Sequence, residues 1–262
     1  MSGDVITKKA IVAVSFGTTH RDARRAIENV ERALTAAFPE RDFYRAFTSG
    51  MVARRILREE GLAIPNPAEL AEQLLARGYK DVIFQSLHVI AGSEFDKLTE
   101  QLAPYRAEFA SLAVGKPLLW DAEDYAEVAR ALTERMPPRE SEAVVFMGHG
   151  SEHPMNAAYS QLENTLRAMG RERAYIGTVE GFPALSYIVS RLARHSVRRV
   201  RLAPLMITAG EHVKNDLNGA SPDSWASQLR SAGYAVEVDT TGLGELDAIA
   251  ELFAKHAAAH CL

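Results

Sequence analysis

The feature that most constrains this 262-residue chain is a strand-to-loop pattern that occurs twice. The first copy has three segments, AIVAVSFGTTH at Ala10–His20, RAFTSGM at Arg45–Met51 and DVIFQSLHVIAGSEFDKL at Asp81–Leu98. The second copy has three matching segments, AVVFMGHGSEH at Ala143–His153, GTVEGFP at Gly177–Pro183 and RVRLAPLMITAGEHVKNDL at Arg199–Leu217. Aligning the copies places Gly17 on Gly148 and Gly92 on Gly210. The repeat predicts two structurally similar halves.

The two copies differ at three positions that each follow an apolar strand. The second copy carries metal-ligand residues there, namely His149, Glu180 and His212. The first copy carries others, namely Thr18, Thr48 and Glu94. The carboxyl ends of parallel strands meet at one edge of a sheet, and imidazole with carboxylate suits Co²⁺, Fe²⁺, Ni²⁺ or Zn²⁺. The difference therefore predicts a divalent-metal site in the second half.

Each of these three residues also has an ordinary structural explanation. His149 lies in a Gly148-His149-Gly150 loop, where it can cap the next helix. Glu180 lies just before Pro183, so its carboxylate can satisfy a helix N-terminus, and His212 can be a plain first-turn residue. Taken singly these explanations are sufficient, but together they are weaker because all three residues occupy equivalent loops.

Apolar runs of strand length alternate with amphipathic, helix-length segments along the chain. Strands are expected at Ala10–Phe16, Asp42–Phe47, Asp81–Leu87, Pro117–Trp120, Ala143–Met147, Ala174–Val179, Val197–Leu205 and Ala235–Asp239. Helices are expected at Arg21–Phe38, Gly50–Glu60, Pro67–Arg77, Glu94–Phe109, Ala122–Arg135, Asn156–Met169, Pro183–Arg194, Ser221–Ala232 and Leu246–His260. Near-continuous apolar strands such as AVVFM indicate parallel strands covered on both faces.

The predicted fold class is therefore α/β, with two similar lobes, each a parallel sheet flanked by helices, and a cleft between them. The Pro-rich, charged junction Met136–Ser141 places the lobe boundary between residues 138 and 139. This gives an N-terminal lobe of residues 1–138 and a C-terminal lobe of residues 139–262 that carries the metal ligands. Periodicity does not decide which lobe the helix at Leu246–His260 covers.

Composition excludes several classes of protein. The chain is 47% hydrophobic and 24% charged, as globular proteins are, and its formal net charge of −4 argues against a nucleic-acid partner. No stretch approaches the ~20 apolar residues of a membrane span, and Met1–Lys9 has no apolar signal region. The only cysteine, Cys261, permits no intrachain disulfide, so a cytoplasmic location is expected. The sequence leaves the oligomeric state open, and a homo-oligomer is possible.

The sequence lacks the common cofactor-binding and nucleophile motifs. The Gly148-His149-Gly150 loop lacks the third glycine of a dinucleotide fingerprint, because position 153 is His. The chain has neither a GxxxxGK[ST] phosphate loop nor a GxSxG nucleophile elbow. No nucleotide cofactor is therefore expected, and the site must be assembled from separate loops.

Four residues of the first half are weaker candidates for the cleft. His88 follows a strand and matches Met206, and a structural role is as consistent with its position as a cleft role. Glu94 matches His212, while Thr18 and His20 occupy the loop that matches the one bearing His149. The remaining histidines are interpreted as structural or solvated: His153 as a helix-start residue, and His195, His256 and His260 as surface residues. The arginine runs at 54–55 and 198–201 are interpreted as solvated faces.

These segments resemble a known family. VVFMGHGSEHPMNAAY, the Glu in TVEGFP, and LAPLMITAGEHVKNDL are similar to the anaerobic sirohydrochlorin cobaltochelatases of the cobalamin pathway. SFGTTHRDAR and QSLHVIAGSEFDKL resemble the same family, so the likeness covers nearly the whole chain. It implies a class II chelatase fold and insertion of Co²⁺, or of Fe²⁺ or Ni²⁺, into sirohydrochlorin without ATP.

In that family two histidines and a glutamate hold the metal, and these map onto His149, Glu180 and His212. His149 is our choice for the catalytic proton acceptor, since its ordinary pKa suits general-base work near neutrality. Two alternatives stay open at this point. A non-enzymatic two-lobed carrier of a tetrapyrrole or metal shares the fold, and a metal-dependent hydrolase would use a metal-bound water.

Overall fold

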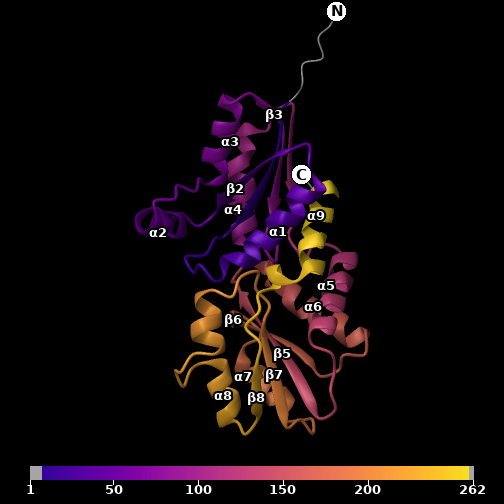
Figure 1. Ribbon diagram of the computed structural model, residues 1–262. Helices are drawn as coiled ribbons and strands as arrows, with labels where there is room; N and C mark the ends of the chain where they lie inside the picture. The colour runs from indigo at the N-terminus through magenta and orange to yellow at the C-terminus, as the bar shows by residue number, and fades with distance from the viewer. Residues whose placement is uncertain (1–7, 260–262) are drawn as a thin grey trace, which may run out of the picture.

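The computed structural model describes residues 8–259, so the expectations on Cys261 and His260 lie outside the described residues. It contains two parallel four-stranded sheets, one above the other in Figure 1, with strand orders β2-β1-β3-β4 and β6-β5-β7-β8. The strands are β1 (Lys8–Ser15), β2 (Asp42–Phe47), β3 (Tyr79–Ser86), β4 (Ser111–Gly115), β5 (Glu142–Gly150), β6 (Ala174–Glu180), β7 (Arg199–Pro204) and β8 (Ala235–Val238). The helices are α1 (Arg24–Ala37), α2 (Gly50–Glu60), α3 (Pro67–Ala76), α4 (Ser93–Leu102), α5 (Ala122–Arg135), α6 (Ala157–Ala168), α7 (Leu185–Leu192), α8 (Trp225–Ser231) and α9 (Asp247–Ala259).

The α/β fold class is confirmed, and the two sheets share one topology. In each sheet the first strand lies between the second and the third, and the fourth forms an edge. The strands themselves are mostly buried, as apolar strands covered by helices on both faces must be. The identical orders support the internal duplication. The division at residues 138 and 139 remains a prediction.

The strand ladders correct the expected alignment of the two copies by two residues. Leu87 N donates to Val14 O, and Leu205 N donates to Met147 O, so Val14 corresponds to Met147. The same step places Gly17 on Gly150 rather than on Gly148. Both glycines have positive φ, +91° and +83°, which supports this equivalence.

As a result His149 occupies the place of Phe16, two residues before Thr18, whereas His212 still corresponds to Glu94. The ladders pair Val14 with Ala46 and Met147 with Gly177, so Glu180 takes the place of Ser49, one residue after Thr48. The sequence alignment followed a shared glycine and held no information on which residues pair between strands. In β1 and β5 a step of two residues keeps every side chain on its face of the sheet, so the apolar pattern cannot detect it.

The fourth strand of the first lobe was predicted wrongly. The strand is Ser111–Gly115, and the apolar run at 117–120 follows it. Leu118 and Leu119 are fully buried, and their backbone N–H groups donate to His88 O and Val89 O beyond the end of β3. The run is therefore apolar because it enters a core. The preceding helix also ends early, at Leu102, followed by a 3₁₀ turn that contains Pro104.

Two helices cross between the lobes. Helix α9, at the C-terminus, packs on α1, β3 and β4 of the first sheet, where it is seen in yellow beside the indigo α1 in Figure 1. Helix α5 precedes the junction but packs on α6, and its Leu132 belongs to one buried cluster with Val144 and Phe146 of β5. These contacts show which lobe the C-terminal helix covers: α9 packs on the first sheet.

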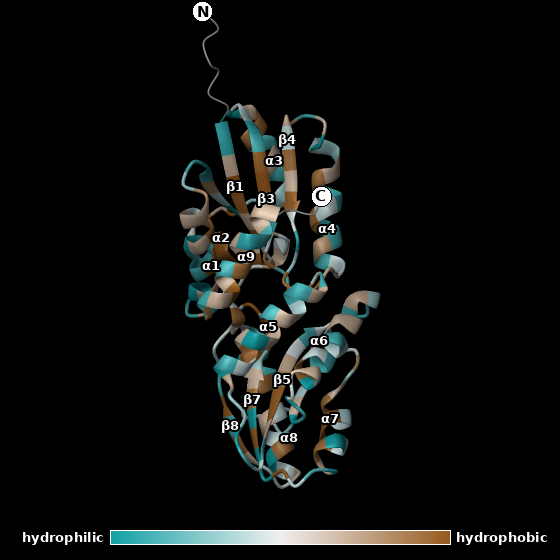
Figure 2. Cartoon of the chain, turned by 90° about the vertical axis from the view of Figure 1, so that its right-hand side faces the viewer, coloured by the Kyte–Doolittle hydropathy of each residue, from teal (hydrophilic) through white to brown (hydrophobic). Residues whose placement is uncertain are grey.

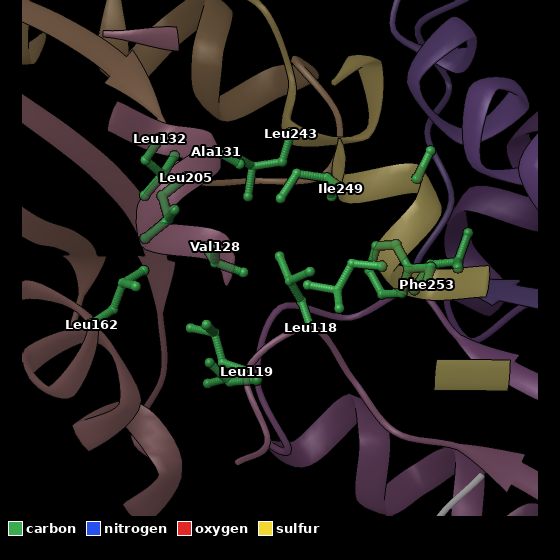
Figure 3. Close-up of a cluster of buried hydrophobic side chains, with 14 of the residues drawn as sticks. Leu118, Leu119, Val128, Ala131, Leu132, Leu162, Leu205, Leu243, Ile249 and Phe253 are labelled. Atoms are coloured by element: carbon green, nitrogen blue, oxygen red, sulfur yellow. The ribbon is translucent and has the colours of Figure 1, made fainter. Parts of the chain in front are cut away.

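The largest buried cluster spans both lobes. Figure 3 shows Leu118, Leu119 and Phe253 on one side and Leu162 of α6 with Leu205, just after β7, on the other, with residues of α5 between them. Figure 2 shows hydrophobic residues along the strands of both sheets, whereas hydrophobic and hydrophilic residues alternate along the helices. Since burial of apolar surface is the main stabilising term, this shared core holds the lobes together.

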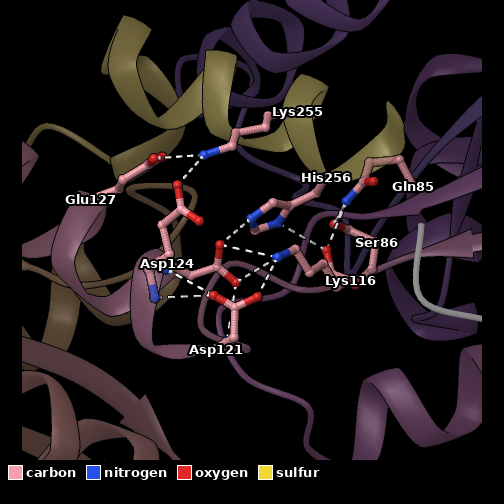
Figure 4. A network of polar contacts seen from close by, with 9 residues as sticks. Gln85, Ser86, Lys116, Asp121, Asp124, Glu127, Lys255 and His256 are labelled. Atoms are coloured by element: carbon pink, nitrogen blue, oxygen red, sulfur yellow. Dashed lines mark hydrogen bonds and ion pairs between the residues drawn. The ribbon is translucent and has the colours of Figure 1, made fainter. Parts of the chain in front are cut away.

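A polar cluster anchors α9, and it corrects the expectation that His256 is solvated. His256 is fully buried; its Nε2 lies 2.8 Å from Asp124 Oδ1, while Lys116 Nζ lies 3.1 Å from Asp124 Oδ2 and 2.7 Å from Asp121 Oδ2 (Figure 4). Burial lowers the pKa of His256 against the opposing effect of Asp124. The residue type is common on solvated helices, but here the ring lies against Lys116 O in the loop after β4 and against Asp124 of α5.

Within residues 8–259, no helix combines the length and the apolar character required to cross a membrane.

Candidate metal and cleft site

The three predicted metal-ligand residues lie together at the carboxyl edge of the second sheet. Strands β6, β5 and β7 are neighbours, and the ladder pairs Gly150 of β5 with Glu180, the last residue of β6. The rings of His149 and His212 meet edge to face with centroids 4.5 Å apart. His149 Nδ1 lies 3.9 Å from Glu180 Oε2. The structure therefore brings together the residues that the sequence singled out, while their role as ligands remains a prediction.

Two glycines hold the His149 loop in place. A Cβ at Gly148 would lie 2.5 Å from Cε1 of Tyr159, and one at Gly150 would lie 1.6 Å from the carbonyl oxygen of Glu180. A side chain at Gly148 would therefore collide with α6 and one at Gly150 with β6, and Gly150 also needs its positive φ. The flanking glycines thus fix His149 beside Glu180.

Hydrogen bonds leave one ring nitrogen of each histidine available. His149 Nδ1 lies 3.0 Å from Gly150 O, so the Nδ1–H can donate to this carbonyl. His212 Nδ1 lies 2.6 Å from Asp216 Oδ2. In both rings the lone pair is then on Nε2, which is the form that binds a metal or accepts a proton.

The site is open to solvent. The side chains of His149, Glu180 and His212 are 47%, 59% and 37% exposed. Within residues 8–259, no three His, Cys, Asp or Glu side chains are already arranged as a metal-binding cluster. The donor atoms must therefore turn inward to share one ion. His149 and Glu180 lie at strand ends rather than in the expected loops, but their side chains are exposed and can turn at small cost.

His212 begins an unusual turn. Residues Val213–Leu217 form a single π-helical turn, a feature that frequently marks functional sites. The turn brings Asp216 back to His212. Sequence analysis missed Asp216, although its spacing of four residues from His212 on a helical turn is a signal that could have identified it.

Thr18 and His20 lie against the loop that carries His212. A Cβ at Gly210 would lie 3.4 Å from Thr18 Oγ1 and 3.8 Å from His20 Cδ2. His20 Nε2 lies 2.9 Å from Glu211 Oε2, and Lys214 Nζ lies 3.3 Å from His20 Nδ1. Because an ammonium can only donate, His20 accepts at Nδ1 and donates from Nε2 to Glu211. Both residues thus belong to a contact between the lobes, and their role toward substrate stays a prediction.

A second ion pair strengthens this contact. Lys214 Nζ lies 2.9 Å from Asp22 Oδ2, and this bond holds the pKa of Asp22 below its usual range. The bond from His20 likewise lowers the pKa of Glu211. Both carboxylates are thus kept ionised beside the His212 loop. Asp22, Glu211 and Lys214 were not identified from the sequence, since residues that meet across a cleft share no local pattern.

His88 and Glu94 lie near each other in the first lobe. His88 Nδ1 lies 2.9 Å from Ser86 Oγ, whereas its Nε2 is buried without a hydrogen-bond partner in the part of the chain that the structure describes. Glu94 Oε2 is also buried without such a partner, with Lys97 Nζ 3.9 Å away. Burial lowers the pKa of His88 to about 4, although the Glu94 carboxylate opposes the shift. Their place in the cleft remains a prediction.

A further bridge connects the lobes near Glu94. His153 Nε2 lies 3.2 Å from Asp96 Oδ2, in the first turn of α4. His153 Nδ1 accepts from Met155 N, which confirms the interpretation of His153 as a helix-start residue. Interlobe contacts therefore lie both at the His212 loop and at the start of α4.

Comparison with known proteins decides the family. The family model described as "Cobalt chelatase (CbiK)" matches residues 9–261. The chain belongs to the cobalt chelatase family. A sirohydrochlorin cobaltochelatase of Salmonella typhimurium is 40% identical over 251 residues, which cover 95% of this chain and 95% of that protein. The sirohydrochlorin cobaltochelatase CbiKC of Nitratidesulfovibrio vulgaris is 30% identical, over 96% of this chain and 90% of that protein.

A solved structure supports the fold of this cobalt chelatase family member. SirB from Bacillus subtilis with Fe³⁺ superposes with a TM-score of 0.68 over 96% of this chain and 95% of its own, at 16% identity. At this identity the likeness concerns the fold alone. It confirms the two-lobed chelatase architecture that the sequence resemblance implied.

Proposed function

We propose that this protein inserts Co²⁺ into sirohydrochlorin without a nucleotide cofactor, as a step of cobalamin biosynthesis. Family membership and the names of two curated relatives support the reaction. The observation that carries the proposal in this chain is the juxtaposition of His149, Glu180 and His212 at the carboxyl edge of the second sheet. The absence of a phosphate-loop motif agrees with a reaction independent of ATP.

Metal capture is assigned to Glu180 and the two Nε2 atoms. The Glu180 carboxylate supplies the negative charge that attracts the hydrated cation, and its exposure lets it meet the ion at the surface. His212 and His149 then contribute neutral imidazole donors, which suit Co²⁺. Three protein ligands leave other coordination positions to water and to the pyrrole nitrogens of the substrate.

Proton removal is assigned to His149. Metalation replaces two pyrrole N–H protons by one divalent ion, so two proton acceptors are needed as the metal–nitrogen bonds form. His149 Nε2 takes one proton, and water at this solvent-exposed edge takes the other. While the ion is held, the lone pair of His149 Nε2 is occupied; when the ion passes to the macrocycle, this lone pair becomes free to accept a proton. Gly150 O keeps the other ring nitrogen protonated throughout. Release of the metal and uptake of the proton are thereby coupled in one side chain.

The first lobe is assigned to the other side of the substrate. Thr18 and His20 border the His212 loop, and His88 and Glu94 have buried polar atoms without partners that a bound macrocycle can satisfy. Backbone N–H groups after Gly17 are further candidates for carboxylate binding. Fe²⁺ is expected to be accepted as a second metal, because the donor set does not exclude it. The reaction is expected to take place in the cytoplasm, with no nucleic-acid or membrane partner.

The test follows the absorbance of sirohydrochlorin after addition of Co²⁺. His149→Ala removes the base and should lower the metalation rate by about 10²-fold or more. Glu180→Ala and His212→Ala should each lower it by at least about tenfold. His195→Ala is the matched control, because His195 is an exposed histidine of the same lobe. Parent rates in all three variants would contradict the assignment. Tight binding of sirohydrochlorin without faster metalation would instead favour the carrier.

A further inference from the structure

A cavity lies at the opposite end of the second lobe from His149. It has a volume of about 190 Å³, opens to solvent and is bounded by the end of α5, the start of β5, the end of α6 and the start of β6. From Glu142 to His149 the strand β5 runs roughly 20 Å at about 3.3 Å per residue, so the cavity is separate from the metal site. One wall is the junction between the lobes, where Met136, Pro138 and Arg139 line it.

Positive charge predominates in the lining. Arg139, Arg171, Arg173 and Arg201 face two glutamates, Glu142 and Glu172. The Arg201 side chain is only 4% exposed, and it bonds to Pro137 O and lies 3.1 Å from Glu142 Oε2. Glu142 is also approached by Arg139 at 3.8 Å and by Arg199 at 3.7 Å, so its charge is already matched. The remaining arginines leave the cavity with an excess of positive charge.

Two buried donors in the wall lack partners. Arg171 Nε and Thr133 Oγ1 are both buried without a hydrogen-bond partner among residues 8–259, and they come from different walls, after α6 and within α5. Within residues 8–259, the Arg171 side chain has no hydrogen bond or ion pair. Arg171 itself is half-buried, but leaving its buried Nε donor without an acceptor is costly, so a bound acceptor would be stabilising. The floor is apolar and includes Phe146 and Leu166.

We propose that this cavity binds a small organic carboxylate. Its acid group accepts hydrogen bonds from Arg171 Nε and Thr133 Oγ1, and its carbon chain packs on Phe146 and Leu166. A planar guanidinium is well suited to a carboxylate, and a charge-assisted hydrogen bond is stronger than one between neutral groups. The volume lies below the ~300 Å³ of ordinary drug-sized pockets, which restricts the ligand to a few carbon atoms. The site is independent of the chelatase chemistry.

The probe for the test is sodium hexanoate, followed by ligand-observed NMR titration of the full chain. Hexanoate should bind the parent with a Kd on the order of 1 mM or tighter. Arg171→Gln should weaken binding by about tenfold, because it removes one charged donor, and Thr133→Val should weaken it by a few-fold. Arg194→Gln is the matched control: it makes the same substitution at an exposed arginine of the same lobe, and it should leave the Kd unchanged.

Several outcomes would overturn the proposal. No binding to the parent would mean that the cavity holds water only. Equal binding of 1-hexanol would show that the charge is not recognised, and equal binding of inorganic phosphate would show that the carbon chain is not. Equal Kd values for the parent and Arg171→Gln would place the ligand elsewhere. Thermal unfolding without ligand shows whether Arg171→Gln folds. If it does not, the Kd of Thr133→Val tests the same site.

Discussion

At the scale of single residues, Asp216 fixes the ring of His212. Its Oδ2 lies 2.6 Å from His212 Nδ1 and so selects the tautomer with a lone pair on Nε2. Asp216→Asn keeps the size of the side chain but removes the charge, so the ring loses its preferred orientation. We expect metalation at limiting Co²⁺ to slow by about 10-fold to 100-fold. The rate is measured by absorbance at several Co²⁺ concentrations.

The control for this change is Asp223→Asn, which removes the same charge from an exposed position on the same lobe. It should metalate at the parent rate. If Asp216→Asn and Asp223→Asn behave alike over the whole range of Co²⁺, then Asp216 does not act through His212.

His88 should make stability depend on pH. Its pKa is about 4 in the folded chain because burial disfavours the charged ring, and it is near 6.5 when the chain unfolds. The stabilisation is therefore complete above pH 6.5 and is lost as the pH falls toward 4, since the unfolded state then binds one more proton. Between pH 7 and 5 we expect His88 to account for a loss of about 1–2 kcal/mol.

Urea unfolding at pH 7 and at pH 5 measures this loss. His88→Gln has no titrating ring and should lose less stability over the same range. Because the ordinary pKa of Asp and Glu lies below this window, carboxylates contribute little to the difference between parent and variant. Equal pH dependence in both proteins would show that His88 is not held neutral by the fold.

At the scale of elements, His256 fixes α9 against the loop that leads into α5. It is fully buried and lies 2.8 Å from Asp124, while its neighbour Lys255 pairs with Glu123 and Glu127 at the surface. His256→Ala should lower the free energy of unfolding by about 2–3 kcal/mol, because Asp124 loses a buried partner but keeps Lys116. Urea denaturation provides the measurement.

Lys255→Ala is the control for α9, since it removes two ion pairs from the exposed side of the same turn. Exposed pairs contribute little, so its unfolding curve should match that of the parent. A larger loss from Lys255→Ala than from His256→Ala would mean that the surface pairs, and not the buried cluster, hold the helix.

At the scale of the whole molecule, the shared core should make the two lobes unfold together. The buried cluster includes Ile27 of α1, Phe253 of α9 and Leu132 of α5, so neither sheet is covered by its own half of the chain alone. Calorimetry of the full chain should show one transition with equal calorimetric and van't Hoff enthalpies. A fragment of residues 1–138 lacks α9 and should not fold cooperatively.

The fragment therefore tests the predicted lobe boundary directly. Near-UV circular dichroism reports packed aromatic side chains, and the fragment should lose this signal. A fragment that melts cooperatively with a native-like spectrum would show that the first lobe is complete without α9.

Sequence alone determined the class of fold and the three residues of the candidate site. Apolar runs such as AVVFM indicate buried parallel strands. An internal repeat can be detected within a single sequence. His149, Glu180 and His212 stood out because each follows a strand, and strand ends are local features. Their convergence follows from neighbouring parallel strands, which the structure confirms.

Tertiary structure alone decided which groups meet across the lobes. His256 and Arg201 belong to residue types that usually face water, yet both are buried, because an element distant in the chain covers each of them. Three further features have no local signal in the sequence: the packing of α5 and α9 on the opposite lobes, the pairing of His20 with Glu211, and the two-residue shift between β1 and β5 in the repeat. Such contacts depend on how helices and strands pack against one another. The packing energy is summed over residues far apart in the sequence, so no short segment of the sequence is sufficient to predict these contacts.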